Sequence, residues 1–373
     1  MSELCTNPLL PCAMTGAASA LAGISDLGVI IHGSSGCYIY ADMAIPDSLY
    51  STFIVQDEVI FGTGERLCEV VESISQLYKK IAVVNTCVPS IMGEDIPEIL
   101  SDYDVISVDV AGFKGDFDSG WKSAIKALNP VCDETKEAVN IEGICSLDPF
   151  YRGNLNEAKR LLNLAEIPIG TTFFHDTYNC TKNPSKYSIS ANPDYDTGVA
   201  EKSFDILGLT ATENAFSKLS EIFQDTDLDA VLSLTEEADE ILTKAGDKFL
   251  RKYDPPRAAV FSTGSYTEFA CNILVKYMDA DIVCAGARNR DITTEAGLKS
   301  DMINHLRPIK SAIERENPDI IIGSSFEYAK FPKVPFVGLT FPIRHIKMLS
   351  HRPVSGPEGS LYFMESVINS LKS

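Results

Sequence analysis

The 373-residue chain contains neither of the glycine-rich sequences with which proteins commonly bind nucleotides. The phosphate-binding sequence GxxxxGK[ST] does not occur, and the dinucleotide-binding sequence GxGxxG is missing as well. The chain itself is therefore not expected to bind ATP or a dinucleotide by these means. GxSxG, which presents the serine of many hydrolases, is also absent, because GSSG at residues 33–36 has a different spacing.

Long apolar segments and basic residues are scarce too. The longest apolar runs, such as LGVIIHG and DIIIG, are far too short to span a bilayer. The N-terminal sequence MSELCTNPLLPC lacks the basic region and apolar core of a secretory signal, so we expect a cytoplasmic protein without a membrane partner. Only 32 Lys and Arg stand against 52 Asp and Glu, and the net charge of −20 disfavours nucleic acid as a partner.

Apolar, β-branched segments alternate with amphipathic ones along the whole chain, which predicts an α/β fold. Continuous apolar strands joined by helices are typical of parallel sheets covered on both faces. The predicted strands are LGVII (27–31), VIFG (59–62), KIAVVNT (80–86), DVISVDV (104–110), EAVNIEGI (137–144), LDAVLSL (228–234), RAAVFST (257–263), DADIVCAG (279–286), PDIIIGS (318–324) and VPFVGLT (334–340).

Two breaks in this pattern divide the chain. One lies near residues 129–138, and the other lies near residues 251–260, where Pro255 and Pro256 mark a linker. We therefore expect three Rossmann-like α/β units, each with a parallel sheet, over residues 1–130, 131–252 and 253–373, the last including a C-terminal segment. Ligand-bearing loops should lie at the carboxyl ends of the strands.

The ten cysteines are too few for a disulfide scaffold, and a reducing compartment also argues against disulfides. Without a CxxC pair, any metal site must be assembled from distant segments. Cys12, Cys37 and Cys87 each lie where a loop meets an expected helix, and helix N-termini favour the thiolate that iron or zinc requires. This spacing favours a metal centre, although three ordinary thiols would produce the same pattern.

Several segments together resemble the nitrogenase component 1 superfamily. They are PCAMTGAASALAGISDLGVIIHGSSGC, DEVIFGTGERLCEVVE and VVNTCVPSIMGEDI, followed by GFKGDFDSGW, VNIEGICSLDPFYRGNLNEAKRLLNLAEI and PDIIIGSSFEYAKFPKVPFVGLTFPI. The order of the three cysteines is the specific part of this resemblance, which covers most of the chain. His32 and Gly33 match the superfamily's HGPxGC-type loop, whereas Ser34 and Ser35 replace the usual proline and its neighbour.

The resemblance implies that Cys12, Cys37 and Cys87 bind a [4Fe–4S] cluster near a subunit interface. A fourth ligand would come from Cys5, an acidic side chain such as Asp57 or Glu58, the partner chain or a non-protein group. It further implies a homodimer that receives electrons from a separate ATP-dependent reductase resembling the nitrogenase iron protein. ATP would be used by that partner and not by this chain.

Nitrogen fixation is not implied, because the residues that hold the molybdenum–iron cofactor of nitrogenase are missing. No cysteine lies near Ala191, and SGPEGS at residues 355–360 has no histidine. The chain instead resembles the tetrapyrrole-reducing branch, most closely the reductive cyclases of nickel-sirohydrochlorin a,c-diamide in methanogen synthesis of coenzyme factor 430. That activity is a six-electron reduction with closure of a γ-lactam ring. Alternatives are another tetrapyrrole such as protochlorophyllide, a non-catalytic scaffold for metallocofactor assembly, or a small-molecule binding protein.

The remaining candidates are expected to be mostly structural. Cys271 and Cys284 lie on apolar helix and strand patterns and Cys68 lies beside the apolar face of a helix, so core positions are favoured. Trp121 is expected to be a packing anchor. His345 and His351 are either proton donors or structural residues, with the structural role favoured. The sequence leaves Cys132, Cys145 and Cys180 undecided.

Overall fold

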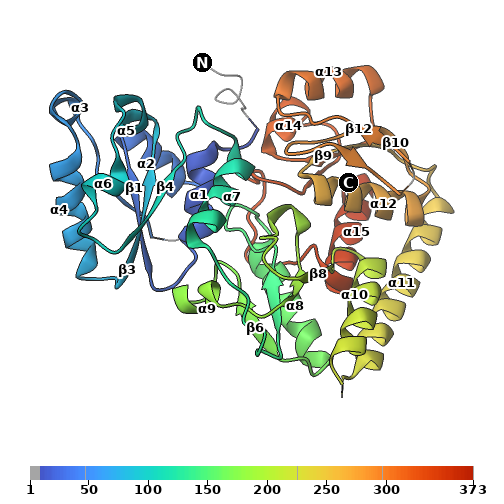
Figure 1. The fold of residues 1–373 in the computed structure, drawn as a ribbon. Coiled ribbons are helices and arrows are strands. Elements are labelled where there is room, and N and C mark those ends of the chain that lie inside the picture. Colours follow the sequence, from blue (N-terminus) through green and yellow to red (C-terminus); the bar gives the residue numbers. More distant parts are fainter. Residues whose placement is uncertain (1–8, 47, 225, 296, 373) are drawn as a thin grey trace. The chain divides into compact units, whose positions relative to one another are not determined.

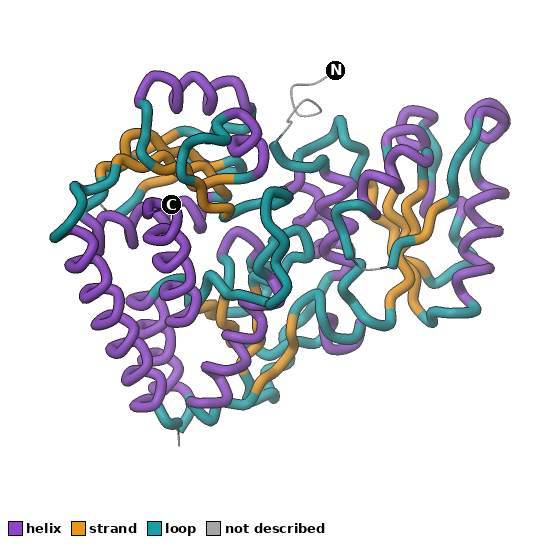
Figure 2. The backbone as a smooth tube through the Cα atoms, turned by 180° about the vertical axis from the view of Figure 1, so that it is seen from behind, coloured by secondary structure: helices purple, strands orange, loops and turns teal. Residues whose placement is uncertain are grey.

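The structure is a computed structural model that describes residues 9–46, 48–224, 226–295 and 297–372. The chain divides into two compact units. Unit 1 comprises Met1–Asp133, Cys145–Leu147 and Thr171–Pro184, and unit 2 comprises Glu134–Ile144, Asp148–Gly170 and Ser185–Ser373. Figure 2 shows strands gathered into sheets with helices around them. No helix among the described residues is long and apolar enough to cross a membrane.

Unit 1 contains a four-stranded sheet in the order β2-β1-β3-β4 (Figure 1). The strands run parallel, and β1 lies between β2 and β3, with Ile30 opposite both Tyr50 and Val83. The strands are β1 (Leu27–His32), β2 (Tyr50–Ser51), β3 (Lys80–Asn85) and β4 (Val105–Asp109). The helices of this unit are α1 (Ala13–Leu21), α2 (Ser35–Asp42), α3 (Gln56–Phe61), α4 (Gly64–Ser75), α5 (Cys87–Met92), α6 (Ile96–Ile99), α7 (Phe117–Leu128) and α9 (Tyr178–Lys182).

Two further four-stranded sheets have the orders β6-β5-β7-β8 and β10-β9-β13-β14. Their strands are β5 (Val139–Glu142), β6 (Ile169–Thr172), β7 (Tyr187–Ser190), β8 (Lys202–Asp205), β9 (Arg257–Ser262), β10 (Asp281–Ala287), β13 (Ile320–Gly323) and β14 (Phe336–Gly338). A small antiparallel pair, β11 (Ile292–Thr293) and β12 (Lys299–Ser300), accompanies them. The helices of unit 2 are α8 (Tyr151–Leu164), the 3-10 turn η2 (Pro193–Tyr195), α10 (Leu209–Ile222), α11 (Leu228–Leu250), α12 (Gly264–Met278), α13 (Leu306–Glu316), α14 (Ser325–Lys330) and α15 (Gly356–Lys372).

These three sheets confirm the predicted α/β architecture with parallel strands. β5 pairs in parallel with β7, β7 with β8, and β9 with both β10 and β13. The division into three domains ending at residues 130, 252 and 373 stays a prediction. In unit 2, the helices α10, α11 and α15 contact one another and lie side by side in Figure 1.

Two predicted strands are wrong, because both segments are helical. Residues 228–234 begin α11, where Asp227 caps the helix by accepting a hydrogen bond from the backbone N–H of Ala230 at 3.1 Å. The apolar residues of this segment belong to the buried face of α11. Seven residues are too few to distinguish such a helical pattern from that of a strand. The buried positions of α11 are Val231, Thr235, Ala238, Leu242, Gly246 and Phe249. Residues 59–62 end α3 instead of forming a strand.

The crossing of α1 and α7 is unusually close because glycines lie at the contact. A Cβ added to Gly16 would overlap the backbone carbonyl of Phe117, and one added to Gly120 would overlap the carbonyl of Ala13. Every residue of α1 is buried. Beside this crossing, Trp121 packs edge-on against Phe174 with 4.7 Å between ring centroids, which confirms its predicted packing role.

His32, the last residue of β1, is fully buried and hydrogen-bonded through both ring nitrogens. The Thr63 hydroxyl donates to the Glu94 carboxylate, so His32 Nε2 must donate to Thr63 Oγ1 at 3.0 Å. Nδ1 then accepts from the Thr52 hydroxyl at 3.1 Å. Burial lowers the pKa of His32 to about 4, although the charge and hydrogen bonding of Glu94 raise it in part. His32 is therefore a neutral structural residue.

Gly120→Ala is expected to destabilise unit 1, because the new methyl group must push α1 away from α7. We expect a loss of about 2 kcal/mol in the free energy of unfolding, measured by urea denaturation. Gly36→Ala is the matched control. Gly36 is an exposed residue of α2 whose added Cβ meets nothing closer than 4.0 Å, so helix propensity should add about 0.5 kcal/mol. Equal stabilities of the two variants would contradict this account.

The neutral His32 predicts a loss of stability on acidification. The unfolded chain binds a proton at the ordinary histidine pKa of 6.5, whereas the folded chain binds it only near pH 4. The stabilising effect is therefore complete above pH 6.5 and disappears as the pH falls through 4, by about 3 kcal/mol at most. The free energy of unfolding should fall more steeply in wild type than in His32→Gln over this range. Parallel curves would show that His32 does not titrate in this way.

Candidate functional site

The carboxyl end of the unit 1 sheet is where its topology favours a ligand. From β1 the chain passes to β2 on one side and then returns to β3 on the other. Such a switch point leaves a crevice between the carboxyl ends of two neighbouring strands, in this case β1 and β3. Cys37 follows β1 and Cys87 follows β3, so these two cysteines lie at the switch point.

All three predicted cysteines begin helices. Cys12 is the N-cap of α1, Cys37 lies in the first turn of α2, and Cys87 is the first residue of α5. Each of the three is half-buried. Two contacts fix the position of Cys12. It caps α1, and it forms an isolated β-bridge with Asp116, the N-cap of α7.

The Cys12 and Cys87 thiols lie together beside Gly112, in the loop after β4. A Cβ added to Gly112 would lie 3.4 Å from the Cys87 sulfur and 3.5 Å from the Cys12 sulfur, so both sulfurs face one point. The backbone N–H of Gly112 also donates to Cys87 Sγ at 3.1 Å. The Cys37 thiol lies in the same unit, and the charges of Cys87 and Cys12 contribute to raising its pKa. A side chain at position 112 would fill the space between the Cys12 and Cys87 sulfurs.

The groups around Cys37 shift the pKa of its thiol in opposite directions. Burial raises the pKa of the Cys37 thiol above its ordinary value, the neighbouring Ser34 and Thr86 side chains lower it, and the charges of Cys87 and Cys12 raise it again. The Ser34 hydroxyl donates to Cys37 Sγ at 3.9 Å. Sequence reasoning missed Gly112, Ser34 and Thr86 as partners of the sulfurs, although a glycine directly after an apolar strand is a signal for close backbone approach.

No group of three or more His, Cys, Asp or Glu side chains among the described residues is arranged to hold a single metal ion. Cys12, Cys37 and Cys87 therefore do not form the closed shell of a structural zinc site. A multinuclear cluster fits these three cysteines, since its thiolate ligands bind different irons. The donor set fits as well, because the sulfurs receive hydrogen bonds from backbone and hydroxyl groups that would stabilise thiolate charge.

The remaining described cysteines lie on other segments of the chain. Cys271 is buried in α12 and Cys284 is half-buried in β10, and burial raises their pKa values to about 12 and about 11. The Cys68 thiol lies 3.9 Å from the carbonyl oxygen of Ile99 and is half-buried on α4. Cys145 is buried, whereas Cys132 and Cys180 are half-buried. Cys5 lies outside the described residues.

The acidic and histidine candidates have structural contacts. Glu58 lies in the first turn of α3 and accepts a hydrogen bond from the backbone N–H of Val55 at 2.7 Å, so it caps that helix. His345 stacks on Tyr328 with 4.7 Å between ring centroids, and burial lowers its pKa. His351 is exposed. Asp57 is an exposed neighbour of Glu58 in the same helix turn.

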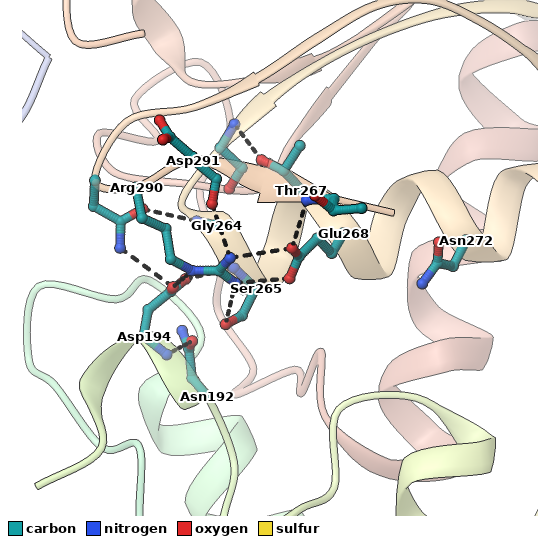
Figure 3. A network of polar contacts seen from close by, with 12 residues as sticks. Asn192, Asp194, Gly264, Ser265, Thr267, Glu268, Asn272, Arg290 and Asp291 are labelled. Carbon is teal, nitrogen blue, oxygen red and sulfur yellow. Dashed lines mark hydrogen bonds and ion pairs between the residues drawn. The ribbon is translucent and has the colours of Figure 1, made fainter. Parts of the chain in front are cut away.

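Unit 2 contains a separate network of polar contacts, shown in Figure 3. Asp194 accepts a hydrogen bond from the backbone N–H of Ser265 at 2.9 Å and so binds the N-terminus of α12. Arg290 donates to Asp194 at 3.3 Å and forms a two-pronged ion pair with Glu268 at 2.7 and 3.1 Å. This network ties the turn η2 to α12 and to the segment after β10.

A cavity of about 290 Å³ lies next to this network, at the lower limit of ligand pockets. Arg290 and Lys276 line it, but both are engaged by carboxylates of the same chain, since Lys276 binds Asp239 at 2.8 Å. Because these ion pairs neutralise Arg290 and Lys276, neither side chain is available to bind an anionic ligand in the cavity. The thiol group of unit 1 is therefore the stronger candidate site.

Several known proteins are similar to this chain. Over 433 residues the chain is 23% identical to a nitrogenase molybdenum-iron protein beta chain of Methanococcus maripaludis, with 98% of this chain and 94% of that protein covered. It is 25% identical to the corresponding beta chain of Frankia alni over 449 residues, with 99% and 83% covered. A structure of nitrogenase Cp1 at pH 6.5 has a similar fold, with a TM-score of 0.73, 18% identity and coverage of 98% of this chain and 93% of that chain.

A family match extends over nearly the whole chain. Residues 12–188 and 194–372 match the family described as nitrogenase component 1 type oxidoreductase. The matched region contains Cys12, Cys37 and Cys87 and all strands of the three four-stranded sheets except the end of β7. The chain belongs to the nitrogenase component 1 type oxidoreductase family.

Proposed function

We propose that this chain is the catalytic component of a nitrogenase-like reductase and that Cys12, Cys37 and Cys87 bind a [4Fe–4S] cluster. The observation that carries the proposal is that the Cys12 and Cys87 sulfurs lie together beside Gly112, while Cys37 follows β1 at the same end of the unit 1 sheet. When bound, such a cluster relays electrons one at a time. The chain's own part is to hold three thiolates, to donate a hydrogen bond from Gly112 to one of them, and to limit access of water.

The fourth ligand is proposed to be a group other than the three cysteines. Glu58 is used in helix capping, which leaves Asp57 as the acidic candidate on α3. The other candidates for the fourth ligand are Cys5, a partner chain or a non-protein group. A donor from a second copy of the chain would be available only if the cluster lies at an interface.

An exposed apolar surface on unit 1 supports an assembly in which two copies of the chain meet near the thiols. It occupies α2 and α3, next to Cys37, and includes α5, which begins with Cys87. Figure 1 labels α3 and α5 next to each other, and the two helices are in contact. Exposed apolar groups on this scale are typical of protein interfaces. The residues of this apolar face are Ile39, Tyr40, Met43, Phe53, Val55, Val59, Ile60, Phe61 and Ile91.

The proposed substrate is a tetrapyrrole, most specifically nickel-sirohydrochlorin a,c-diamide, which would be reduced with γ-lactam formation. Support comes from the residues that replace the cofactor ligands of nitrogenase. Ala191, directly after β7, is fully buried and offers no donor atom, and residues 355–360 at the start of α15 contain no histidine. The electron donor is proposed to be an ATP-dependent iron–sulfur reductase, since this chain has no phosphate-binding loop of its own.

An anaerobic assay tests the substrate directly. Purified chain, ATP and a nitrogenase-iron-protein-like reductase are incubated with either nickel-sirohydrochlorin a,c-diamide or protochlorophyllide. ATP-dependent reduction of the nickel compound supports the proposal, and reduction of protochlorophyllide alone would replace its substrate. An iron-loaded chain that reduces neither compound would instead favour a scaffold for metallocofactor assembly.

Replacing Cys12, Cys37 or Cys87 by alanine should lower the iron content of anaerobically purified protein by at least about half, since each change removes one of three chain ligands. Iron and acid-labile sulfide are the measurements, and far-ultraviolet circular dichroism checks that the fold is retained. Cys271→Ala and Cys284→Ala are the controls. They should keep wild-type iron and lose only about 1 to 2 kcal/mol of stability. Wild-type iron in all three ligand variants would refute the assignment.

Phe61→Glu should weaken the proposed homodimer by about tenfold or more, because Phe61 is an aromatic side chain that is 86% exposed in the apolar face. Anaerobic light scattering over a concentration series measures the effect. Leu77→Glu is the control, since Leu77 is 69% exposed after α4 and lies outside the apolar face. Dissociation by both variants alike, or a wild type that is monomeric with full iron content, would argue against this interface.

A further inference from the structure

Residues 328–357 contain no Asp or Glu, although the chain has 52 acidic residues among 373. This stretch lies between Glu327 and Glu358 and contains five basic residues and two histidines. In a protein of net charge −20, it concentrates positive charge in one place. The basic residues are Lys330, Lys333, Arg344, Lys347 and Arg352, and the histidines are His345 and His351.

Within this stretch, residues 344–352 form an irregular segment, here called the cationic strap, that is fixed to unit 2 at both ends. At the first end, the backbone N–H of Arg344 donates to Ser325 Oγ at 2.6 Å, and His345 stacks on Tyr328. At the second end, the Arg352 guanidinium lies over the Tyr362 ring at 5.5 Å. Directly after the strap, the backbone N–H of Val354 donates to Asn154 Oδ1 at 2.8 Å. The strap is therefore held in a defined position.

Its middle part is exposed and combines positive charge with apolar groups. Arg344, Lys347 and Arg352 are all exposed, and Leu349 between them is 96% exposed. Within the part of the chain that the structure describes, no carboxylate forms an ion pair with any of these three basic side chains. By contrast, Arg288 and Arg290 of the same unit each bind a glutamate of the chain. The strap keeps its positive charges available for another molecule.

The strap also follows a sheet edge suited to ligands. It comes after β14, which pairs with β13 in a parallel sheet, so the chain leaves that sheet at its carboxyl end. Loops at the carboxyl ends of strands are where open α/β sheets bind small molecules. Burial lowers the pKa of His345, which favours its neutral form. Arg344, Lys347 and Arg352 supply permanent positive charge in the strap.

We propose that the cationic strap binds the carboxylate groups of a multiply carboxylated macrocycle, with Leu349 against the apolar face of the ring. The inference rests on the proposed function, in which the substrate is a tetrapyrrole, and it names the part of the chain that recognises the substrate's acidic rim. Its physical basis is charge. A polycarboxylate is repelled by an acidic protein, so productive binding needs a local positive surface whose cations are not already neutralised.

The experiment measures the binding of two stable macrocycles to the full-length chain by absorbance or fluorescence titration. Nickel uroporphyrin is an octacarboxylate, and nickel mesoporphyrin is a dicarboxylate with a similar ring. The variant Arg344→Gln/Lys347→Gln should bind the octacarboxylate about threefold to tenfold more weakly than wild type, with a smaller change for the dicarboxylate. The difference should shrink as salt concentration rises.

Lys248→Gln is the matched control, because Lys248 is an exposed lysine of α11 outside the acid-free stretch, and it should leave both affinities unchanged. Equal octacarboxylate affinities of wild type and the double variant would overturn the proposal while leaving a tetrapyrrole function intact. Binding of neither macrocycle to any form would count against the tetrapyrrole function itself. Dissociation of a homodimer by the double variant, with unchanged macrocycle binding, would assign the strap to a protein interface and also overturn the proposal.

Discussion

The pairing of β1 with β3 is the interaction on which the candidate site depends. The two strands run parallel in a register that places His32 opposite Asn85, so both strands end at the same level. The next residues keep the strand ends together. Thr86 donates through its hydroxyl to the carbonyl oxygen of His32 at 2.9 Å, and a Cβ on Gly33 would overlap the Thr86 side chain. Cys37 and Cys87 follow these two ends, so the register brings the segments that carry them to the same edge of the sheet.

The third thiol depends on a different contact. Cys12 lies at the start of α1, and α1 is held by its close crossing with α7 and by the bridge between Cys12 and Asp116. Residues separated by about a hundred positions thus fix one sulfur, while a pair of neighbouring strands fixes the other two. Rigid elements on three sides explain how thiols without any CxxC spacing can face one point.

The sequence was most informative where strands are central and apolar. β1, β3, β9 and β13 are buried along nearly their whole length, so their composition alone predicts them. The short strand β2 and the largely exposed β8 carry no such signal and were not predicted. Periodicity misassigned the start of α11 because the segment was read over too few residues. The cysteine positions followed from strand and helix boundaries, but their convergence with Gly112 depends on strand register, which no local pattern contains.

Electrostatics differ between the interior of unit 2 and its surface. Inside, cations are matched to carboxylates. Arg288 and Glu327 form a fully buried pair at 2.8 Å, and Ser324 also hydrogen-bonds with both. A buried ion pair contributes to stability mainly when all of its polar atoms have hydrogen-bond partners. Most polar atoms of the Arg288–Glu327 pair have such partners. The cationic strap is the opposite case, an exposed basic segment on an acidic chain.

The distribution of the three thiols along the chain has a consequence for synthesis on the ribosome. Cys12 is translated before Cys37 and Cys87, but its position depends on α7, which ends only at Leu128. Gly112, which separates the Cys12 and Cys87 sulfurs, is also made after all three cysteines. An iron donor would therefore meet the assembled set of thiols only once this first part of the chain has emerged and folded. Until then the nascent chain exposes isolated cysteines that oxidation can modify.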